Sequence, residues 1–216
     1  MQTFSVRTAF ACLLLCSSAA LSAHPHLFMT SSAEFVWEKD RLAGFWLEWE
    51  FDQFFSTDTI YAHDVDRNGS LNAAEIKEVY NNAFINLKNY YFFTFIRQGG
   101  NRWNPPGVRN FTAGIRPGGV LWYRFFIDLS TAAPGEINVA VYDYTFFCDI
   151  RSPDKNPVKL TFDPQYANPS WSVVENKDFP VYYNPLGGWD DTTIYYEWKK
   201  GLETYYPREI RISYAK

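Results

Sequence analysis

The segment Phe45-Trp46-Leu47-Glu48-Trp49-Glu50-Phe51-Asp52 decides the fold class of this chain. Large apolar side chains occupy every second position of the segment, and its three acidic side chains alternate with them towards the end. This period of two is typical of a β-strand with one buried and one solvated face. A shorter run of the same kind, residues 34–38, precedes it across the polar turn Lys39-Asp40-Arg41, so the two segments together predict a β-hairpin.

Further strands are predicted on both sides of one helical interval. Apolar runs separated by Pro-Gly, Gly-Gly and Ser-Pro turns predict strands at residues 108–115, 120–129, 137–142, 144–150 and 158–162, with short strands after residue 171 that end at 209–214. Helical spacing predicts an amphipathic helix whose buried face carries Ile76, Val79, Tyr80, Ala83, Phe84 and Leu87. The expected fold class is therefore α+β: a single mostly antiparallel, sandwich-like β-domain over residues 24–216, with a helical insertion at about residues 55–90.

Composition excludes two broad classes of protein. Of the 216 residues, 47% are hydrophobic and 20% are charged, which is the balance of a globular chain rather than a disordered one. The 19 Phe, 15 Tyr and 8 Trp, against only 2 Met, favour a β-rich fold because flat rings suit a pleated surface. The formal net charge is −4 and no basic run stands out, so nucleic acid is not an expected partner.

Residues 1–23 are predicted to be a secretory signal peptide. Arg7 supplies the short basic start, an apolar stretch runs over residues 9–16, and small residues follow up to Ala23. The apolar stretch is well short of the roughly 20 residues that a spanning helix needs, which disfavours a membrane anchor. Cleavage after Ser22 or Ala23 would leave an exported, periplasmic chain that is soluble and not inserted in the membrane, with Cys148 as its one cysteine.

The strongest chemical signal is the twelve-residue stretch from residue 64 to residue 75. It matches the EF-hand calcium loop, in which alternate oxygen-bearing side chains surround one hard cation and a central glycine, here Gly69, permits a sharp bend. In that pattern Ser70 contributes its backbone carbonyl, and the last residue contributes two oxygens from the first turn of the next helix. The expected Ca²⁺ ligands are Asp64, Asp66, Asn68, Ser70, Asn72 and Glu75.

A polar turn that caps a helix without binding metal is the alternative for this loop. Asn72 and Glu75 have the spacing of an N-cap residue and its partner three residues later, which suits either interpretation. The sequence has one such loop, whereas calcium sensors pair two and expose a Met-rich groove. We therefore expect a structural Ca²⁺ site with a Kd on the order of 10⁻⁴–10⁻³ M, which is weak enough to require the calcium of an extracytosolic compartment.

The histidines are the second chemical signal. His24 and His26 flank Pro25 at the start of the predicted mature chain, and His63 directly precedes the calcium loop. Residues i and i+2 of an extended strand point to the same side, so His24 and His26 are predicted to hold one transition-metal ion such as zinc. The alternative is a frayed terminus with two solvated histidines. Cys148, in a strand-like run, is expected to be a buried apolar side chain.

The opening His24-Pro25-His26-Leu27-Phe28 after a signal peptide resembles that of an exported family known as domain of unknown function 1007. The similarity continues through WEFDQFFS at residues 49–56, the 64–75 loop, YYFFT at 90–94 and VYDYTFF at 141–147. Members are described as periplasmic components of ABC-type transport systems and resemble the periplasmic partner of a zinc permease. The resemblance implies a periplasmic accessory protein that binds a transition metal, zinc above all, through His24 and His26 and serves a membrane permease; His63 joins this set on its position alone.

Two other functions fit parts of the sequence. An N-terminal histidine with a second histidine is also the arrangement of copper monooxygenases, which would require the mature chain to begin at His24. A calcium-stabilised structural or adhesive domain is the other possibility. Serine-nucleophile motifs, phosphate-binding glycine loops and Cys-x-x-Cys pairs are missing from the sequence, so we expect a binding protein rather than an enzyme.

Overall fold

The computed structural model describes residues 24–214, which open with the predicted β-hairpin. β1 (Leu27–Glu38) pairs antiparallel with β2 (Arg41–Phe51). Phe45, Leu47 and Trp49 are fully buried on one face of β2, which confirms the period of two. β1 begins at Leu27 rather than at residue 34, because its earlier part pairs with β2 as well. The predicted signal peptide, residues 1–23, lies outside the described residues.

The hairpin forms the middle of a six-stranded sheet with the order β5-β6-β2-β1-β8, in which β9 also pairs with β1. The strands added to the hairpin are β5 (Arg109–Arg116), β6 (Val120–Asp128), β8 (Cys148–Arg151) and β9 (Val158–Thr161). The pairs between β1, β2, β6 and β5 are antiparallel as expected, but β8 and β9 run parallel to β1. Parallel pairing needs a crossover connection, and the chain makes it by passing through the second sheet before it returns to β1.

The second sheet has five strands in the order β10-β13-β7-β3-β4. Its members are β3 (Thr94–Gln98), β4 (Asn101–Trp103), β7 (Gly135–Val141), β10 (Ser170–Glu175) and β13 (Arg208–Tyr214), and β11 (Val181–Tyr183) and β12 (Glu203–Tyr205) form a separate two-stranded sheet. The sequence did not predict β3 and β4. Both are short, and the run Thr94-Phe95-Ile96 that begins β3 is buried throughout and does not alternate.

One hydrophobic core contains residues of both large sheets. Phe35 and Leu47 from the first sheet belong to the same buried cluster as Val139 and Ile212 from the second. The rings of Trp37 and Tyr214 meet edge to face with their centroids 5.5 Å apart, which joins the two sheets directly. The β-rich α+β class expected from the sequence is therefore confirmed.

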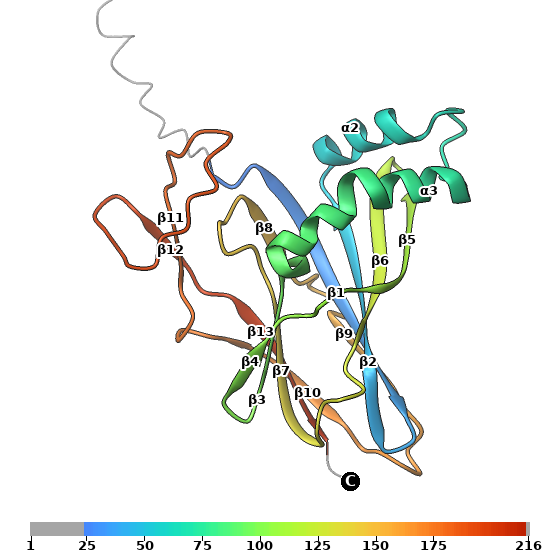
Figure 1. Ribbon diagram of the computed structural model, residues 1–216, viewed down its shortest axis with the longest axis vertical. Coiled ribbons are helices and arrows are strands. Elements are labelled where there is room, and N and C mark those ends of the chain that lie inside the picture. Colours follow the sequence, from blue (N-terminus) through green and yellow to red (C-terminus); the bar gives the residue numbers. More distant parts are fainter. Residues whose placement is uncertain (1–23, 215–216) are drawn as a thin grey trace, which may run out of the picture.

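The helical segment follows β2 and lies beside β5 and β6 in Figure 1. It consists of α2 (Gln53–His63), α3 (Ala73–Val79), a π-helical turn η1 (Tyr80–Phe84) and a 3₁₀ segment η2 (Ile85–Phe93). All six residues of the predicted amphipathic face are buried or half-buried, which confirms the helical period. No helix among residues 24–214 is both long enough and apolar enough to cross a membrane.

The strand predicted at residues 144–150 is wrong in its first half, because β8 begins only at Cys148. A side-chain turn interrupts the run: Asp143 Oδ1 accepts hydrogen bonds from the backbone N and the hydroxyl of Thr145, and Asp143 Oδ2 accepts one from Cys148 N. Local bonds of this kind compete with strand pairing. Cys148 itself is buried, as expected, and burial raises the pKa of its thiol.

Candidate functional site

The loop between α2 and α3 positions the predicted calcium ligands. α2 ends at His63 and α3 begins at Ala73, so the loop residues stand between two helices. Gly69 has φ +77°, the left-handed conformation that the sharp bend requires. Asn72 caps α3 by accepting hydrogen bonds from Ala74 N and Glu75 N, while Glu75 Oε2 accepts one from Asn72 N. This reciprocal capping box confirms the spacing noted in the sequence.

Three of the six predicted ligands converge on one point. Carboxylate oxygens of Asp64, Asp66 and Glu75 all lie within 4.8 Å of one another, and these residues are the one such His, Cys, Asp or Glu group among residues 24–214. Two oxygens bound to the same Ca²⁺, each 2.3–2.6 Å from it, can be separated by up to about 5 Å, so the spacing fits a shared ion. These carboxylates also accept hydrogen bonds from nearby backbone N atoms, and the side-chain oxygens of Asn68 and Asn72 accept them from Ser70 N and Ala74 N.

The local charge balance favours a cation in this loop. Asp64 and Glu75 are buried, and within the described part of the chain neither they nor Asp66 form a salt bridge with a basic side chain. Arg67, the basic residue of the loop, holds its guanidinium over the Tyr61 ring, 5.9 Å from the centroid. Buried carboxylates normally need a pairing cation or a metal. The residues present therefore fit a hard divalent ion with oxygen ligands.

His24 and His26 form a second site at the start of β1. Their rings meet edge to face with the centroids 4.7 Å apart, and the ring of Phe147 lies 5.1 Å from that of His26. His24 Nε2 lies 2.9 Å from the carbonyl oxygen of Asp191, and His26 Nε2 lies 3.3 Å from that of Gly188. A carbonyl oxygen can only accept, so each Nε2 atom is the donor in its contact, and Nδ1 is the other nitrogen of each ring.

A carboxylate that the sequence did not connect with the histidines lies against the same space. A Cβ atom placed on Gly187 would stand 2.5 Å from Asp191 Oδ2 and 3.0 Å from His24 Nδ1, so both atoms face the small volume that this glycine leaves open. Hydrogen bonds from Thr193 and the charge of His24 hold the pKa of Asp191 below its usual value. The lowered pKa keeps Asp191 ionised beside the His24 ring, and carboxylate oxygen and imidazole nitrogen are both ligand types that zinc accepts.

His63 does not join this pair. It is the last residue of α2, whose first turn is held near the start of β1 by Asp52, since Asp52 Oδ2 accepts a hydrogen bond from Phe28 N. Eleven helical residues carry His63 about 15 Å along the axis from there. Figure 1 shows α2 leading away from β1 towards the calcium loop. His24 and Asp191 are 167 positions apart in the sequence, so the tertiary fold and not a local pattern brings them together.

A largely apolar cavity of about 430 Å³ adjoins the histidine pair. It lies between the helical segment and the first sheet, since Leu87 and Tyr90 line it from η2 and Met29, Trp49 and Tyr123 line it from β1, β2 and β6. Phe147 and Thr192 form the wall that it shares with the histidines. Cavities of this size and lining are typical of small-molecule sites.

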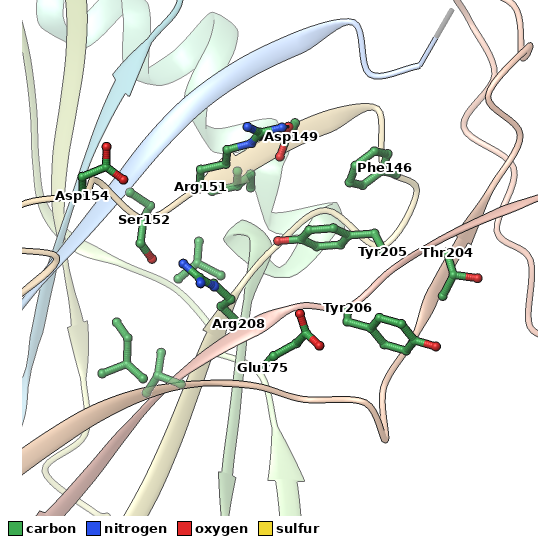
Figure 2. Close-up of a pocket in the computed structure, with 15 residues that line it drawn as sticks. Phe146, Asp149, Arg151, Ser152, Asp154, Glu175, Thr204, Tyr205, Tyr206 and Arg208 are labelled. Carbon is green, nitrogen blue, oxygen red and sulfur yellow. Dashed lines mark hydrogen bonds and ion pairs between the residues drawn. The ribbon is translucent and has the colours of Figure 1, made fainter. Parts of the chain in front are cut away.

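A larger cavity of about 530 Å³, lined by both polar and apolar side chains, includes residues of β8 and is drawn in Figure 2. Figure 2 shows the hydroxyl of Tyr205 and the guanidinium of Arg208 directed into it. Arg151 is 2.6 Å from the buried carboxylate of Asp149, so this pair is internally neutralised. Burial raises the pKa of Tyr205 to about 12. The charges that line this cavity have both signs and select no single class of ligand.

Comparison with known proteins places the chain in a family. The family model described as "Protein of unknown function (DUF1007)" matches residues 9–214. An "Uncharacterized 15.5 kDa protein in trpE 3'region" from Spirochaeta aurantia is 33% identical over 129 residues, which cover 56% of this chain and 91% of that protein. No solved structure gives a significant match to the chain. Since the family model spans nearly the whole sequence, the protein belongs to the family of proteins of unknown function DUF1007.

Proposed function

We propose that this protein is an exported, periplasmic accessory protein of a transition-metal transport system, and that it binds zinc at its N-terminal histidine pair. The observation that carries the proposal is that the His24 ring lies against the His26 ring on one side and faces the Asp191 carboxylate across Gly187 on the other. The ligand atoms of these three residues do not all lie within 4.8 Å of one another, so small side-chain rotations would have to bring them onto one ion; two imidazole nitrogens and one carboxylate would then leave a position for water. A site of this kind suits a protein that must release its metal, since structural zinc sites are closed by four protein ligands.

The backbone contacts of the two rings support ligand roles for their Nδ1 atoms. The carbonyl oxygens of Asp191 and Gly188 would hold the orientation of each imidazole, as acceptors behind the ligands do in zinc proteins. Both carbonyls and the Asp191 carboxylate belong to one segment, residues 187–191. The same short loop would therefore orient the histidines and supply the third ligand.

The segment next to the histidines also favours a protein partner. Trp189 is 79% exposed and Tyr196 is 85% exposed, although large aromatic side chains are normally covered. Aromatic residues are enriched at protein interfaces. We propose that this segment docks on a membrane permease, so that the metal is transferred where the two proteins touch and the role is binding rather than catalysis.

Calcium has a structural role in this proposal. Asp64, Asp66 and Glu75 would hold Ca²⁺ in an EF-hand-like insertion between α2 and α3, with Asn68, Ser70 and Asn72 as the further ligands that the loop motif assigns. The ion would neutralise the three carboxylates and fix the angle between the helices. It takes no part in binding the transition metal, because the two sites lie at opposite ends of α2.

Zinc titration of the mature chain, residues 24–216, tests the proposal. We expect one zinc per chain by calorimetry, with the affinity lowered at least tenfold in His24→Ala and in His26→Ala. His63→Ala is the matched control and should bind as the parent does. Gly187→Ala keeps every proposed ligand but fills the space between Asp191 and His24, so it should weaken binding as well.

Measurements on protein purified from the periplasm identify the cleavage site and the native metal. Intact mass should give a chain that starts at Ala23 or His24, and elemental analysis should show zinc together with calcium. The zinc proposal fails if the double variant His24→Ala/His26→Ala binds zinc as tightly as the parent, or if calcium is the one metal present.

A further inference from the structure

Two residues that line the apolar cavity beneath the helical segment each carry a buried polar atom with no hydrogen-bond partner among the described residues. These atoms are the indole Nε1 of Trp49 and the phenolic hydroxyl of Tyr123. Buried polar atoms are hydrogen-bonded in the great majority of cases, and an unpaired one costs free energy. The two atoms therefore call for an explanation.

The two residues are direct neighbours across the sheet. Trp49 of β2 is paired in register with Tyr123 of β6, so their side chains leave the same face side by side. Cross-strand partners have Cβ atoms about 4.5–5.5 Å apart. Both groups can donate a hydrogen bond, and the indole N–H can only donate. An acceptor atom on a ligand that reached either group could take a hydrogen bond from it.

The other residues that line the cavity indicate the polarity and charge of the ligand. Apart from Asp143 and Thr145, the lining is mainly aromatic and aliphatic, and it includes no Lys or Arg. The Asp143 carboxyl group already accepts bonds from Thr145 and Cys148, so it needs no donor from a ligand, and burial raises its pKa. With no basic side chain in the lining, the cavity offers an anion no counter-charge. The volume of about 430 Å³ is within the range of small-molecule sites.

We propose that this cavity binds a neutral, mainly apolar small molecule whose acceptor oxygen receives hydrogen bonds from Trp49 Nε1 and Tyr123 Oη. The apolar body of the ligand packs against the aromatic rings of the cavity, and small shifts of those rings bring the acceptor to the two buried donors. The proposal is independent of the metal sites, since none of their proposed ligands lines the cavity.

Three probes of similar shape test the class of ligand: acetophenone, ethylbenzene and benzoate. Acetophenone carries a neutral acceptor, ethylbenzene has none, and benzoate is an anion. In NMR titrations of the parent protein we expect acetophenone to bind at least as tightly as ethylbenzene, although its carbonyl must leave water, and benzoate to bind at least tenfold more weakly than acetophenone.

Tyr123→Phe removes one donor and keeps the ring, so the variant is expected to fold and to unfold at no lower temperature than the parent. The affinity of acetophenone relative to ethylbenzene should fall about tenfold in this variant. Trp37→Phe is the matched control, because Trp37 Nε1 is also buried without a described partner but does not line the cavity. In Trp37→Phe the affinity of acetophenone relative to ethylbenzene should equal that of the parent.

Two results would overturn the proposal. The first is that neither neutral probe binds the folded parent protein. The second is that both bind but Tyr123→Phe leaves their relative affinity unchanged, which is the result expected if water satisfies the two donors or if the probes occupy another place. Preferred binding of benzoate would contradict the inferred neutrality of the ligand.

Discussion

Glu34 is the centre of a charge network on the outer face of the first sheet. Its carboxylate accepts hydrogen bonds from Lys159 Nζ at 2.6 Å, Arg124 Nη2 at 2.7 Å and Thr161 Oγ1 at 2.8 Å. Burial alone would raise the pKa of Glu34, but the bonds from Lys159, Arg124 and Thr161 outweigh it and lower that pKa to about 2. The ionised form is therefore stabilised in the folded protein.

A carboxylate whose pKa is depressed on folding stabilises above its unfolded pKa and loses that effect as the pH falls towards its folded pKa. We expect Glu34→Gln to lower the free energy of unfolding by about 1–2 kcal/mol at pH 7, after allowance for solvent screening of the partners. The difference from the parent should shrink below pH 4.5 and vanish near pH 2. Urea unfolding at a series of pH values measures it.

Glu38→Gln is the control for that experiment. Glu38 pairs with Arg41, but both side chains are more than half exposed, so its substitution should change stability by less than about 0.5 kcal/mol at any pH. A Glu34→Gln difference that stayed constant from pH 7 to pH 3 would contradict the network described here.

Arg97 and Glu209 form the most deeply buried ion pair of the second sheet. Glu209 is buried. Its carboxylate accepts one hydrogen bond from Arg97 Nε at 3.1 Å and another from Asn176 Nδ2 at 2.8 Å. Removal of one partner leaves a buried charge without its counter-ion, so Arg97→Ala should lower the free energy of unfolding by about 2–4 kcal/mol at pH 7. Arg211→Ala breaks an exposed pair with Glu136 on the same sheet and should cost less than about 1 kcal/mol. Equal losses in the two variants, measured by urea unfolding, would be the contrary result.

Residues differ in how far their roles can be predicted from the sequence. The loop at residues 64–75 is local, so its spacing alone predicted that Asp64, Asp66 and Glu75 would meet. The place of Asp191 beside His24 could not be predicted, because nothing in residues 184–194 indicates that they fold back onto His24. The Trp49 and Tyr123 donors likewise become a pair only through the register of β2 and β6.

At the scale of elements, Asp52 fixes the start of α2 against β1. Its Oδ1 accepts the N-cap hydrogen bond from Phe55 N at 2.8 Å, and its Oδ2 accepts one from Phe28 N at 2.8 Å. Asp52→Ala loses both bonds, so we expect a loss of about 1–3 kcal/mol in the free energy of unfolding. Asp52→Asn keeps an acceptor at the cap and should recover about half of that loss.

The comparison variant for Asp52 lies on the same helix. Asp58→Ala changes an exposed position of α2 that has no described side-chain hydrogen bond. Urea unfolding should therefore show a loss of less than about 0.5 kcal/mol in the free energy of unfolding. If Asp52→Ala were no more destabilising than Asp58→Ala, the cap would not hold the helix to the sheet.

Elements that bury one regular face could be predicted from the sequence, and the others could not. β2 and the helix around Val79 show clean periods of two and of 3.6, and both were located correctly. β3 lacks an alternating pattern because its first three residues are all buried. The run before β8 is apolar enough for a strand, but the bonds that Asp143 accepts from Thr145 and Cys148 turn the chain instead.

At the scale of the whole molecule, long-range order joins the two sheets. β8 and β9 come back from the second sheet to lie parallel to β1, and no local pattern encodes such a return. The shared core, with Trp37 against Tyr214, means that neither large sheet can be unfolded without exposing apolar surface of the other. Both sheets should therefore unfold together.

The helical segment is tied to this core, so an ion bound in its loop should stabilise the whole molecule. Val79 and Phe84 belong to the same buried cluster as the strands of both sheets. For a Kd on the order of 10⁻⁴–10⁻³ M, 5 mM Ca²⁺ should add about 1–2 kcal/mol to the free energy of unfolding and raise Tm by roughly 2–8 °C. Calorimetry should show one transition before and after calcium addition, with equal calorimetric and van't Hoff enthalpies.

Glu75→Gln separates metal binding from helix capping. Glutamine can still accept a hydrogen bond from Asn72 N in the capping box, but it removes one of the three carboxylate charges. The variant should unfold near the Tm of the calcium-free parent and should shift by less than about 1 °C in 5 mM Ca²⁺. If calcium does not change the Tm of the parent, the loop caps α3 without binding calcium. Two transitions, of which calcium moves one, would show that the insertion unfolds apart from the sheets.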